Sequence, residues 1–290
     1  EDIELRNTQP SEYELFAVDN IEFDRTILTN NIIELPTPKG IQRFKIVEAS
    51  VFSPELAAKF PTIKSYVAYG IDDKTARARI SKSSVGIHAM ISSGKYPLYL
   101  IDPYTKDKKT AITYFKNKSK KERFTCLVEE TVIPFKRTFQ KANNANDGKL
   151  RTYKLALVAT GAYSQYHLAQ QGVGAGETDA VKKAAVLSAI NTSITRINGI
   201  FERDLGVTMQ LVSNNENIIF LDASTDGLTD GNANSLITEV QSKIDAVIGS
   251  ANYDVGHGFG KDSNGNGLAA FQSVCNPLEK GQGVSILDTP

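Results

Sequence analysis

The stretch that decides the fold is Thr152-Tyr-Lys-Leu-Ala-Leu-Val-Ala159, an apolar strand pattern, together with the long segment from Thr178 to Leu205. In this segment apolar residues recur every three or four positions, which is typical of one buried face of an α-helix. Thr178 suits an N-cap and Gly206 suits a helix end. A strand followed by a long helix predicts an α/β layer here. The apolar stripe consists of Leu187, Ile190, Ile194, Ile197, Phe201 and Leu205.

Downstream of this helix the pattern alternates again between strand and helix. A glycine-rich turn separates the first strand from the long helix, and a second helix is expected over residues 234–248, ending at Gly249. Further strands are expected at 207–212, 217–221, 253–257 and 267–274. This order predicts a mixed, mostly parallel sheet with two long helices.

The first half of the chain has a different pattern. Short apolar or alternating stretches between Pro, Gly, Asn and Asp predict strands at 44–51, 67–69, 85–91, 96–101, 111–115 and 124–128, and a short helix over 54–60. The overall class is therefore α+β, with a β-rich domain at residues 1–140 and an α/β domain at 152–290. Between them, residues 141–151 are small and polar, which indicates an ordinary interdomain loop or an activation cleavage site flanked by Lys149 and Arg151.

Composition excludes several classes of protein. The 290 residues are 41% hydrophobic and 23% charged, with no apolar run of about 20 residues, so a disordered chain or a membrane span is not expected. The net charge is zero, and the lysine-rich stretch at 106–121 is best interpreted as a solvated face, so we expect no nucleic-acid partner. Residues 1–150 carry a net +5 and residues 151–290 a net −5, so the halves should attract each other.

No complete catalytic or metal site can be assigned from spacing alone. The three histidines, His88, His167 and His257, are far apart, and each favours a structural role. Part of a calcium loop is present, but Ser273 stands where a bidentate glutamate would complete it, so weak calcium binding competes with a plain turn. The candidate calcium ligands are Asp262, Asn264 and Asn266, and the nearby acidic loop of Asp222, Asp226 and Asp230 is expected to be solvated.

Several segments in the second half follow one another in a recognisable order: Thr152–Tyr163, Ala189–Asp204, Ile248–His257 and Gly267–Cys275. Together they resemble the reprolysin-like (adamalysin-type) metzincin zinc endopeptidases of the secreted bacterial type. Residues 1–145, with the segments Leu35–Gly40, Pro54–Phe60 and Gly70–Asp73, are similar to the propeptide that precedes such catalytic domains.

The resemblance implies a zinc cofactor, a protein or peptide substrate and a propeptide docked in cis on the catalytic half. It also implies that Gly267, Leu268, Ala269, Ala270 and Phe271 form the edge strand that pairs with an extended substrate, unless that strand is covered. The family binds zinc through His-Glu-x-x-His, and this chain stops at Pro290 without that motif, so we expect it to be inactive alone.

Two cysteines have roles that the resemblance leaves open. Cys126 is a candidate zymogen switch that ligates zinc, or a buried structural cysteine, because the surrounding sequence is not the family's usual switch motif. Cys275 corresponds to a cysteine that normally forms a disulfide with a residue further along, so pairing with Cys126 and two free thiols both remain open.

The function expected is therefore a zymogen-type fragment of a secreted, extracellular zinc metalloendopeptidase. Glu1 is not a methionine, which fits removal of a leader or a shortened chain. An alternative is a non-catalytic extracellular binding or adhesion module that uses the same exposed strand edge. A small-molecule enzyme is disfavoured because neither a phosphate loop nor an activated nucleophile is present.

Overall fold

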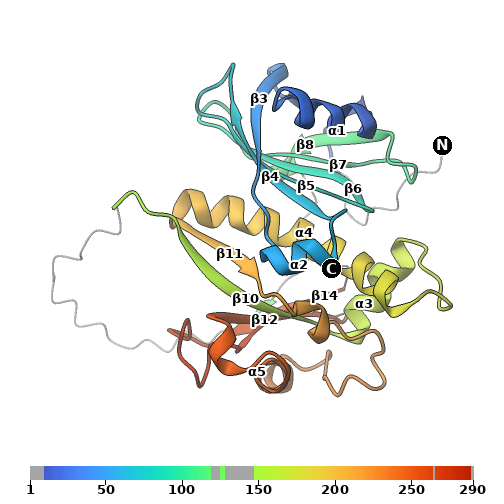
Figure 1. Cartoon of the computed structure of the whole chain (residues 1–290), viewed down its shortest axis with the longest axis vertical. Helices are drawn as coiled ribbons and strands as arrows, with labels where there is room; N and C mark the ends of the chain where they lie inside the picture. Colours follow the sequence, from blue (N-terminus) through green and yellow to red (C-terminus); the bar gives the residue numbers. More distant parts are fainter. Residues whose placement is uncertain (1–9, 119–124, 128–146, 264, 289–290) are drawn as a thin grey trace.

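Figure 1 shows the computed structural model of the chain, in which residues 10–118, 125–127, 147–263 and 265–288 are described. Two β-sheets organise it. An eight-stranded sheet has the order β1-β8-β7-β6-β5-β4-β3-β2, and a six-stranded sheet has the order β11-β10-β12-β14-β13-β9. Helices cover the second sheet, so the predicted α+β class is confirmed.

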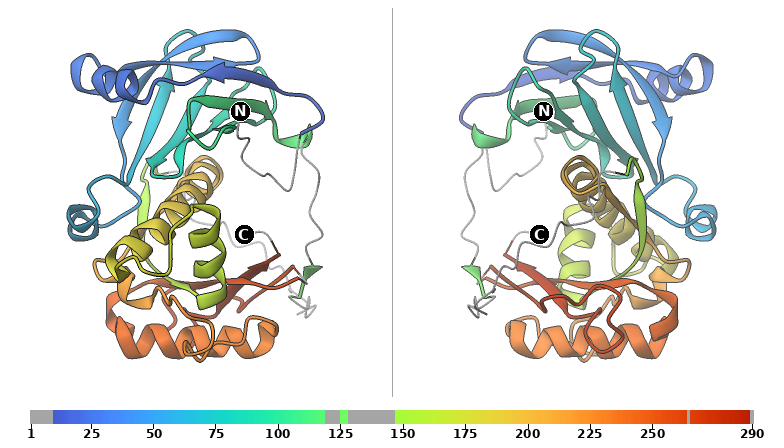
Figure 2. Two further views of the ribbon diagram at one scale, coloured as in Figure 1. Left: turned by 90° about the vertical axis from the view of Figure 1, so that its right-hand side faces the viewer. Right: turned by 90° about the vertical axis from the view of Figure 1, so that its left-hand side faces the viewer.

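All neighbouring strands of the first sheet are antiparallel. β1 and β2 are its two edges, and the sheet curls toward a barrel without closing (Figure 2). The strands are β1 (Glu14–Ala17), β2 (Ile32–Thr37), β3 (Gly40–Glu48), β4 (Lys64–Gly70), β5 (Arg77–Ser83), β6 (Gly86–Ser92), β7 (Tyr99–Pro103) and β8 (Thr110–Phe115).

Two helices belong to this half. α1 (Asn20–Thr29) was not predicted, and its N-cap Asp19 accepts hydrogen bonds from the backbone N–H groups of Ile21 and Glu22, both at 2.9 Å. α2 (Pro54–Lys59) confirms the predicted short helix, with Ser53 as N-cap and proline at the first helical position. A short 3₁₀ helix, η1 (Lys116–Lys118), follows β8.

The second sheet is mostly parallel, as predicted. β10 (Arg151–Ala159) lies between β11 (Val207–Leu211), which is at one edge, and β12 (Val255–Lys261), and it is parallel to both. Next come β14 (Gly283–Leu287), parallel to β12, and β13 (Asn266–Ala269), antiparallel to β14. The outermost strand is β9 (Thr125–Cys126), which lies within the predicted strand 124–128.

Helices lie on both faces of this sheet. α3 (Gly161–Gln170) and α4 (Asp179–Asp204) cover one face, and α5 (Ala233–Val247) covers the other (Figure 2). The two predicted long helices are confirmed. Residues 161–170 form a helix where a turn was expected, because Thr160 caps the segment by accepting from the N–H of Tyr163 at 3.2 Å.

One predicted strand is wrong. Residues 217–221 do not form a strand, and η2 (Asn215–Ile218) is a 3₁₀ helix followed by an isolated bridge between Ile219 and Ala159. The physical reason is Asn215, whose carboxamide pairs with both the N–H and the carbonyl of Leu157, at 2.8 and 3.0 Å. A side chain thus replaces the strand ladder there. A last 3₁₀ helix, η3 (Ser250–Asn252), precedes β12.

Alternate glycines in β12 let α5 lie close to the sheet. A Cβ on Gly258 would lie 2.5 Å from Val240, and a Cβ on Gly256 would lie 2.6 Å from Ile244. These contacts are too short for any side chain, so the glycines set the helix–sheet distance.

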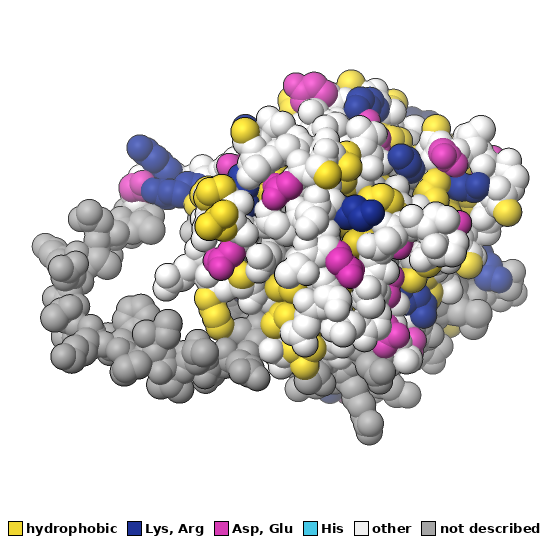
Figure 3. Space-filling model, turned by 90° about the horizontal axis from the view of Figure 1, so that it is seen from below, with side chains coloured by type: hydrophobic (Ala, Val, Ile, Leu, Met, Phe, Trp, Pro, Cys, Tyr) yellow, Lys and Arg dark blue, Asp and Glu magenta, His cyan; other side chains and the backbone are white. Residues whose placement is uncertain are grey.

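Acidic, basic and apolar side chains are mixed on the face of the molecule that is seen from below (Figure 3).

α4 lies between the two sheets and contacts β4, β5 and β6 of the first (Figure 1). The first half also contributes directly to the core of the second. Val51, Phe52, Leu56 and Ile63 belong to one buried cluster with residues of β10, β11, α3 and α4. The backbone of Leu211 bonds this segment on both sides, with distances of 2.7 Å to Val51 and 2.9 Å to Ser53. The two halves therefore share this buried cluster, and each half also has a cluster of its own.

Ion pairs join the halves as well. Glu202 of α4 accepts from Arg77 at 2.7 Å and from Arg79 at 2.5 Å, and both the carboxylate and Arg79 are only 4% exposed. Lys59 of the first half pairs with Glu216 of the second, so the positive charge again lies on the first half. Arg196 of α4 pairs with Asp102 of β7, and in this pair the positive charge lies on the second half.

Candidate functional site

The candidate substrate-binding strand lies at the rim of the second sheet. β13 pairs with β14 on one side, with Gly267 opposite Ser285 and Ala269 opposite Gly283. It ends at Ala269, earlier than the predicted 267–274, because the chain turns sharply afterwards. Gln272 has a φ of 56°, and the Ser273 hydroxyl donates to the carbonyl of Ala270 at 3.1 Å. Within the predicted edge strand, Ala270 and Phe271 thus lie in the following turn.

The other side of β13 is covered by residues of the predicted propeptide. Thr125 and Cys126 lie opposite Asn266 and Gly267 in a parallel pair, and the N–H of Leu127 donates to the carbonyl of Gly267 at 2.9 Å. Within the described residues, β9 is therefore the final strand of the sheet. No sequence pattern predicts this pairing, although a strand was expected at 124–128.

Both cysteines are exposed free thiols in the structure. Because Cys126 is exposed on the strand that covers β13, the alternative of a buried structural cysteine is wrong. Cys275 lies in the turn after β13, with a φ of 62° and its N–H donating to the carbonyl of Asp254 at 2.9 Å. The structure contains no Cys126–Cys275 disulfide.

The described part of the chain holds no group of three or more His, Cys, Asp or Glu that could hold a metal ion, but two of the three calcium candidates are asparagines, which lie outside that set of residue types. Asp262 follows β12, Asn266 begins β13, and Asn264 lies outside the described residues. Because one of the three candidates lies outside the described residues, weak calcium binding stays a prediction.

Two aspartates of the neighbouring loop have structural roles, and the prediction that they are merely solvated is wrong. Asp226, 3% exposed, accepts from the N–H of Gly161 at 2.7 Å at the start of α3. Asp230 accepts from the hydroxyl of Thr160 at 2.7 Å and from the N–H of Lys261 at 2.8 Å. Burial raises the pKa of Asp230, and the nearby Asp226 raises it further.

The histidines do not converge, so the described donors do not fit a zinc site. His88 bonds Asp102 at 2.7 Å on the face of the first sheet that packs against α4. His167 is on α3 beside Tyr163, and burial lowers its pKa to about 4. His257 is on β12, where its Nε2 lies 3.0 Å from the Ser285 hydroxyl and burial again lowers the pKa to about 4. Neutral, buried imidazoles of this kind support packing.

Only the end of the predicted activation linker can be placed, because residues 141–146 lie outside the described part. Lys149 is exposed ahead of β10. Arg151 is the first residue of β10, paired with Val207, and its guanidinium bonds Asp147 at 2.7 Å. Of the two basic residues, Lys149 is the more accessible to a protease.

The comparisons with known proteins agree with this architecture. No curated protein matches the chain. A family model described as metallo-peptidase family M12B, reprolysin-like, matches residues 187–288, which hold most of α4 together with α5, β12, β13 and β14. Residues 187–288 are therefore part of a reprolysin-like metallopeptidase domain of family M12B.

Proposed function

We propose that the chain is the zymogen-type front portion of a secreted zinc metalloendopeptidase. Residues 1–140 would be the propeptide, 141–151 the activation linker, and 152–290 the first part of the catalytic domain. The observation that carries the proposal is the pairing of β9 with β13 at the rim of a sheet that belongs to a peptidase family. The substrate class is protein or peptide.

An extended peptide binds a sheet edge through the backbone groups that the last strand leaves unpaired. Gly267 is the residue on β13 whose carbonyl accepts from Leu127 and which lies opposite Cys126. A substrate strand on this edge would need the same backbone groups. Substrate and β9 therefore compete for one edge, which supports inhibition in cis.

The contacts between the halves support a propeptide held firmly in place. Glu202 binds two arginines of β5, and Phe52 and Leu56 lie in the same core as α4. These contacts keep β9 at a high effective concentration beside β13, so even a two-residue strand can remain paired.

Zinc belongs to this proposal through the family alone. The described histidines point to three separate environments, so no zinc ligand is assigned and no catalytic step is derived. Metal analysis of the purified chain should find at most weak, substoichiometric zinc, and casein should not be cleaved. Tight equimolar zinc would show that the ligand assignment is wrong.

Cys126 remains the candidate switch because its thiol is carried by the strand that occupies the edge. A thiolate binds zinc well and would compete with water for the metal. In a full-length zymogen that carries the family's zinc-binding motif, Cys126→Ser should shorten the latency before activity appears. Unchanged latency would leave strand pairing as the whole of the inhibition.

Pairing can be tested on this chain with proline. Leu127→Pro removes the N–H that donates to Gly267, whereas Leu127→Ala keeps it and serves as the matched control. Amide hydrogen exchange in β9 and β13 should rise, and a fluorescent extended peptide should bind, only in the proline variant. Equal peptide binding by both variants and the original chain would refute the shared edge.

Two further points concern membrane-spanning helices and the alternative function. Among the described residues, no helix is both long and apolar enough to cross a bilayer. Export to the extracellular space stays part of the proposal. The alternative, a non-catalytic module that presents a free strand edge, is less well supported because β9 occupies that edge in the folded chain.

A further inference from the structure

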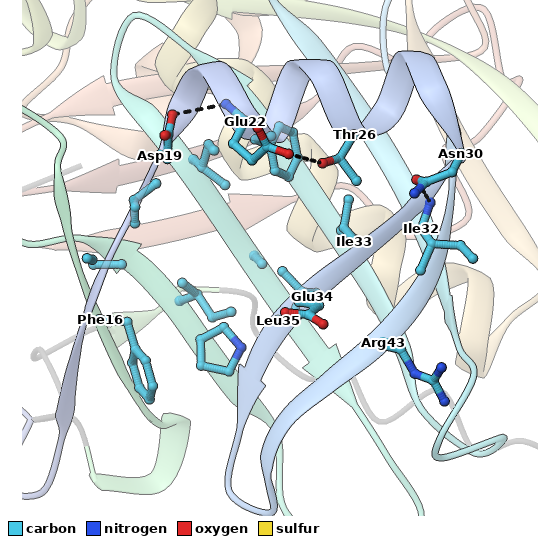
Figure 4. Close-up of a pocket in the computed structure, with 18 residues that line it drawn as sticks. Phe16, Asp19, Glu22, Thr26, Asn30, Ile32, Ile33, Glu34, Leu35 and Arg43 are labelled. Atoms are coloured by element: carbon cyan, nitrogen blue, oxygen red, sulfur yellow. Dashed lines mark hydrogen bonds between the residues drawn. The ribbon is translucent and has the colours of Figure 1, made fainter.

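The first sheet contains a cavity that the peptidase proposal does not use. Because the sheet does not close, a seam is left between its edge strands β1 and β2, and α1 crosses one end of it (Figure 4). Behind the seam is a cavity of about 490 Å³. This volume falls in the range of small-molecule sites, roughly 300–1,000 Å³.

The walls of the cavity are apolar and built from several strands. Small residues, Ala89 and Ala111, form part of the back wall and leave the space that larger side chains would fill. Phe16 of β1 lies on one side of the seam, and Ile33 and Leu35 of β2 lie on the other (Figure 4). An apolar occupant would be shielded from water on both sides, which favours its binding.

α1 completes the enclosure without being buried itself. Phe23 packs partly against the core of the sheet, and Thr26 also lines the cavity, while Ile21 and Leu28 are 73% and 86% exposed. None of the residues of α1 is fully buried. Phe23 also contacts the ring of Tyr66 edge-on, and Asp24 pairs with Lys82, so the helix is held along its length while its inner face borders the cavity.

The charges at the mouth select the polar end of an occupant. Three carboxylates, Asp19, Glu22 and Glu34, border the cavity with a single guanidinium, that of Arg43. Arg43 is engaged by Asp72 at 2.6 Å and Glu22 by Arg25 at 2.7 Å, so the remaining charge at the mouth is that of Asp19 and Glu34. The local field is therefore negative, and it disfavours an anionic headgroup at short range.

We propose that this cavity binds an elongated apolar small molecule whose polar end is uncharged or cationic, such as a long-chain alcohol or amine. The apolar chain lies against Ala89, Ala111 and Leu35. The polar end lies at the mouth beside Glu34. The site is separate from β13 and does not depend on peptidase activity.

The absence of tryptophan from the sequence makes a direct test possible. Phe16→Trp places the single indole on the cavity wall. Dodecanol and dodecylamine, titrated below their aggregation limits, should shift its emission saturably to shorter wavelength, and dodecanoate should bind about tenfold or more weakly because of charge repulsion. Phe271→Trp, at a position 62% exposed on the other half, is the control that should show no shift.

Filling the cavity gives the second test. In the Phe16→Trp background, Ala89→Phe or Ala111→Phe should weaken binding by about tenfold or more, since each fills space that the ligand needs. Leu28→Phe on the outer side of α1 should leave binding unchanged. If a filled variant does not fold by circular dichroism, Ala111→Ile replaces it.

Three results would overturn the proposal. They are no saturable shift in Phe16→Trp, an equal shift in Phe271→Trp, and unchanged affinity in a folded cavity-filled variant. Tighter binding of dodecanoate than of dodecylamine would refute the charge argument, and Glu34→Lys should reduce the preference for the amine if that argument is correct.

Discussion

Replacing Glu202 by alanine should lower the free energy of unfolding by about 3–5 kcal/mol, the usual cost of breaking a buried ion pair from one side. The Glu202 carboxylate and the Arg79 guanidinium are each 4% exposed. Without Glu202, Arg79 keeps a hydrogen bond from Nη1 to the carbonyl of Ala49 at 3.2 Å but no carboxylate. Arg77 is 35% exposed and can turn to water, so most of the loss comes from Arg79.

Two comparisons separate this cause from a general loss of charge. Asp72→Ala breaks an exposed pair with Arg43 and should cost at most about 1 kcal/mol. The double change Arg79→Met with Glu202→Leu removes both buried charges and should recover most of the stability lost in Glu202→Ala.

The assay is urea unfolding at pH 7, with the slope of the transition checked in each variant. Amide hydrogen exchange should rise in β5 and α4, which Glu202 joins, before it rises in α5. A cost for Glu202→Ala that equals that of Asp72→Ala would refute the reasoning, because it would mean that Arg79 is adequately solvated without its partner.

Three further predictions concern other parts of the chain. Leu56→Ala should cost about 2–5 kcal/mol and keep one unfolding transition, because the fully buried Leu56 lies in the core shared by both halves; two separate transitions in urea would contradict this. Burial lowers the pKa of His167 and His257 to about 4, so unfolded chains bind more protons below pH 6.5 and stability should fall by about 2 kcal/mol per histidine between pH 7 and 5. His167→Phe should remove that share of the loss, and an unchanged pH dependence would count against it. In limited trypsin digestion, cleavage on the C-terminal side of Lys149 should occur earlier in time than cleavage on the C-terminal side of Arg151, as mass spectrometry of the new N-terminus can show. The reverse order would mean that β10 frays.

The helices of the second half could be predicted because the information is local. α4 has an apolar stripe at helical spacing, a Thr178 cap that accepts from the N–H of Val181, and Gly206 with a φ of 64° after its end. α5 has a similar stripe and ends beside Gly249. Each signal lies within a few residues of the feature that it specifies, so no tertiary information was needed.

Elements whose stability depends on distant partners escaped prediction. The polar sequence of β5 does not predict a buried strand. Its polar face is nevertheless buried, because Arg79 donates to Glu202 and the Ser81 hydroxyl bonds that of Thr192 on α4. Conversely, residues 217–221 read as a strand, yet the Asn215 side chain takes the backbone groups that a strand would need. In both places a long-range polar contact outweighs the local pattern.

The candidate site shows the same limit. The family resemblance implied an edge strand at β13, but its cover, β9, is only two residues long and about 140 positions earlier in the chain. A pair of that length has no periodicity to detect. The pairing is decided by where the first half is anchored, through Leu56 and Glu202, and not by the sequence of β9 itself.

This anchoring also determines what a cut after Lys149 can do. Such a cut breaks neither the pairing of β9 with β13 nor the packing of Val51, Phe52 and Leu56 in the shared core. The two-residue strand is held by few hydrogen bonds, whereas the core segment buries several large apolar side chains, each contributing about 1.5–3 kcal/mol. A competing peptide strand can therefore displace β9 while the rest of the first half stays bound, so opening of the edge and dissociation of the halves are separate events with very different free-energy costs.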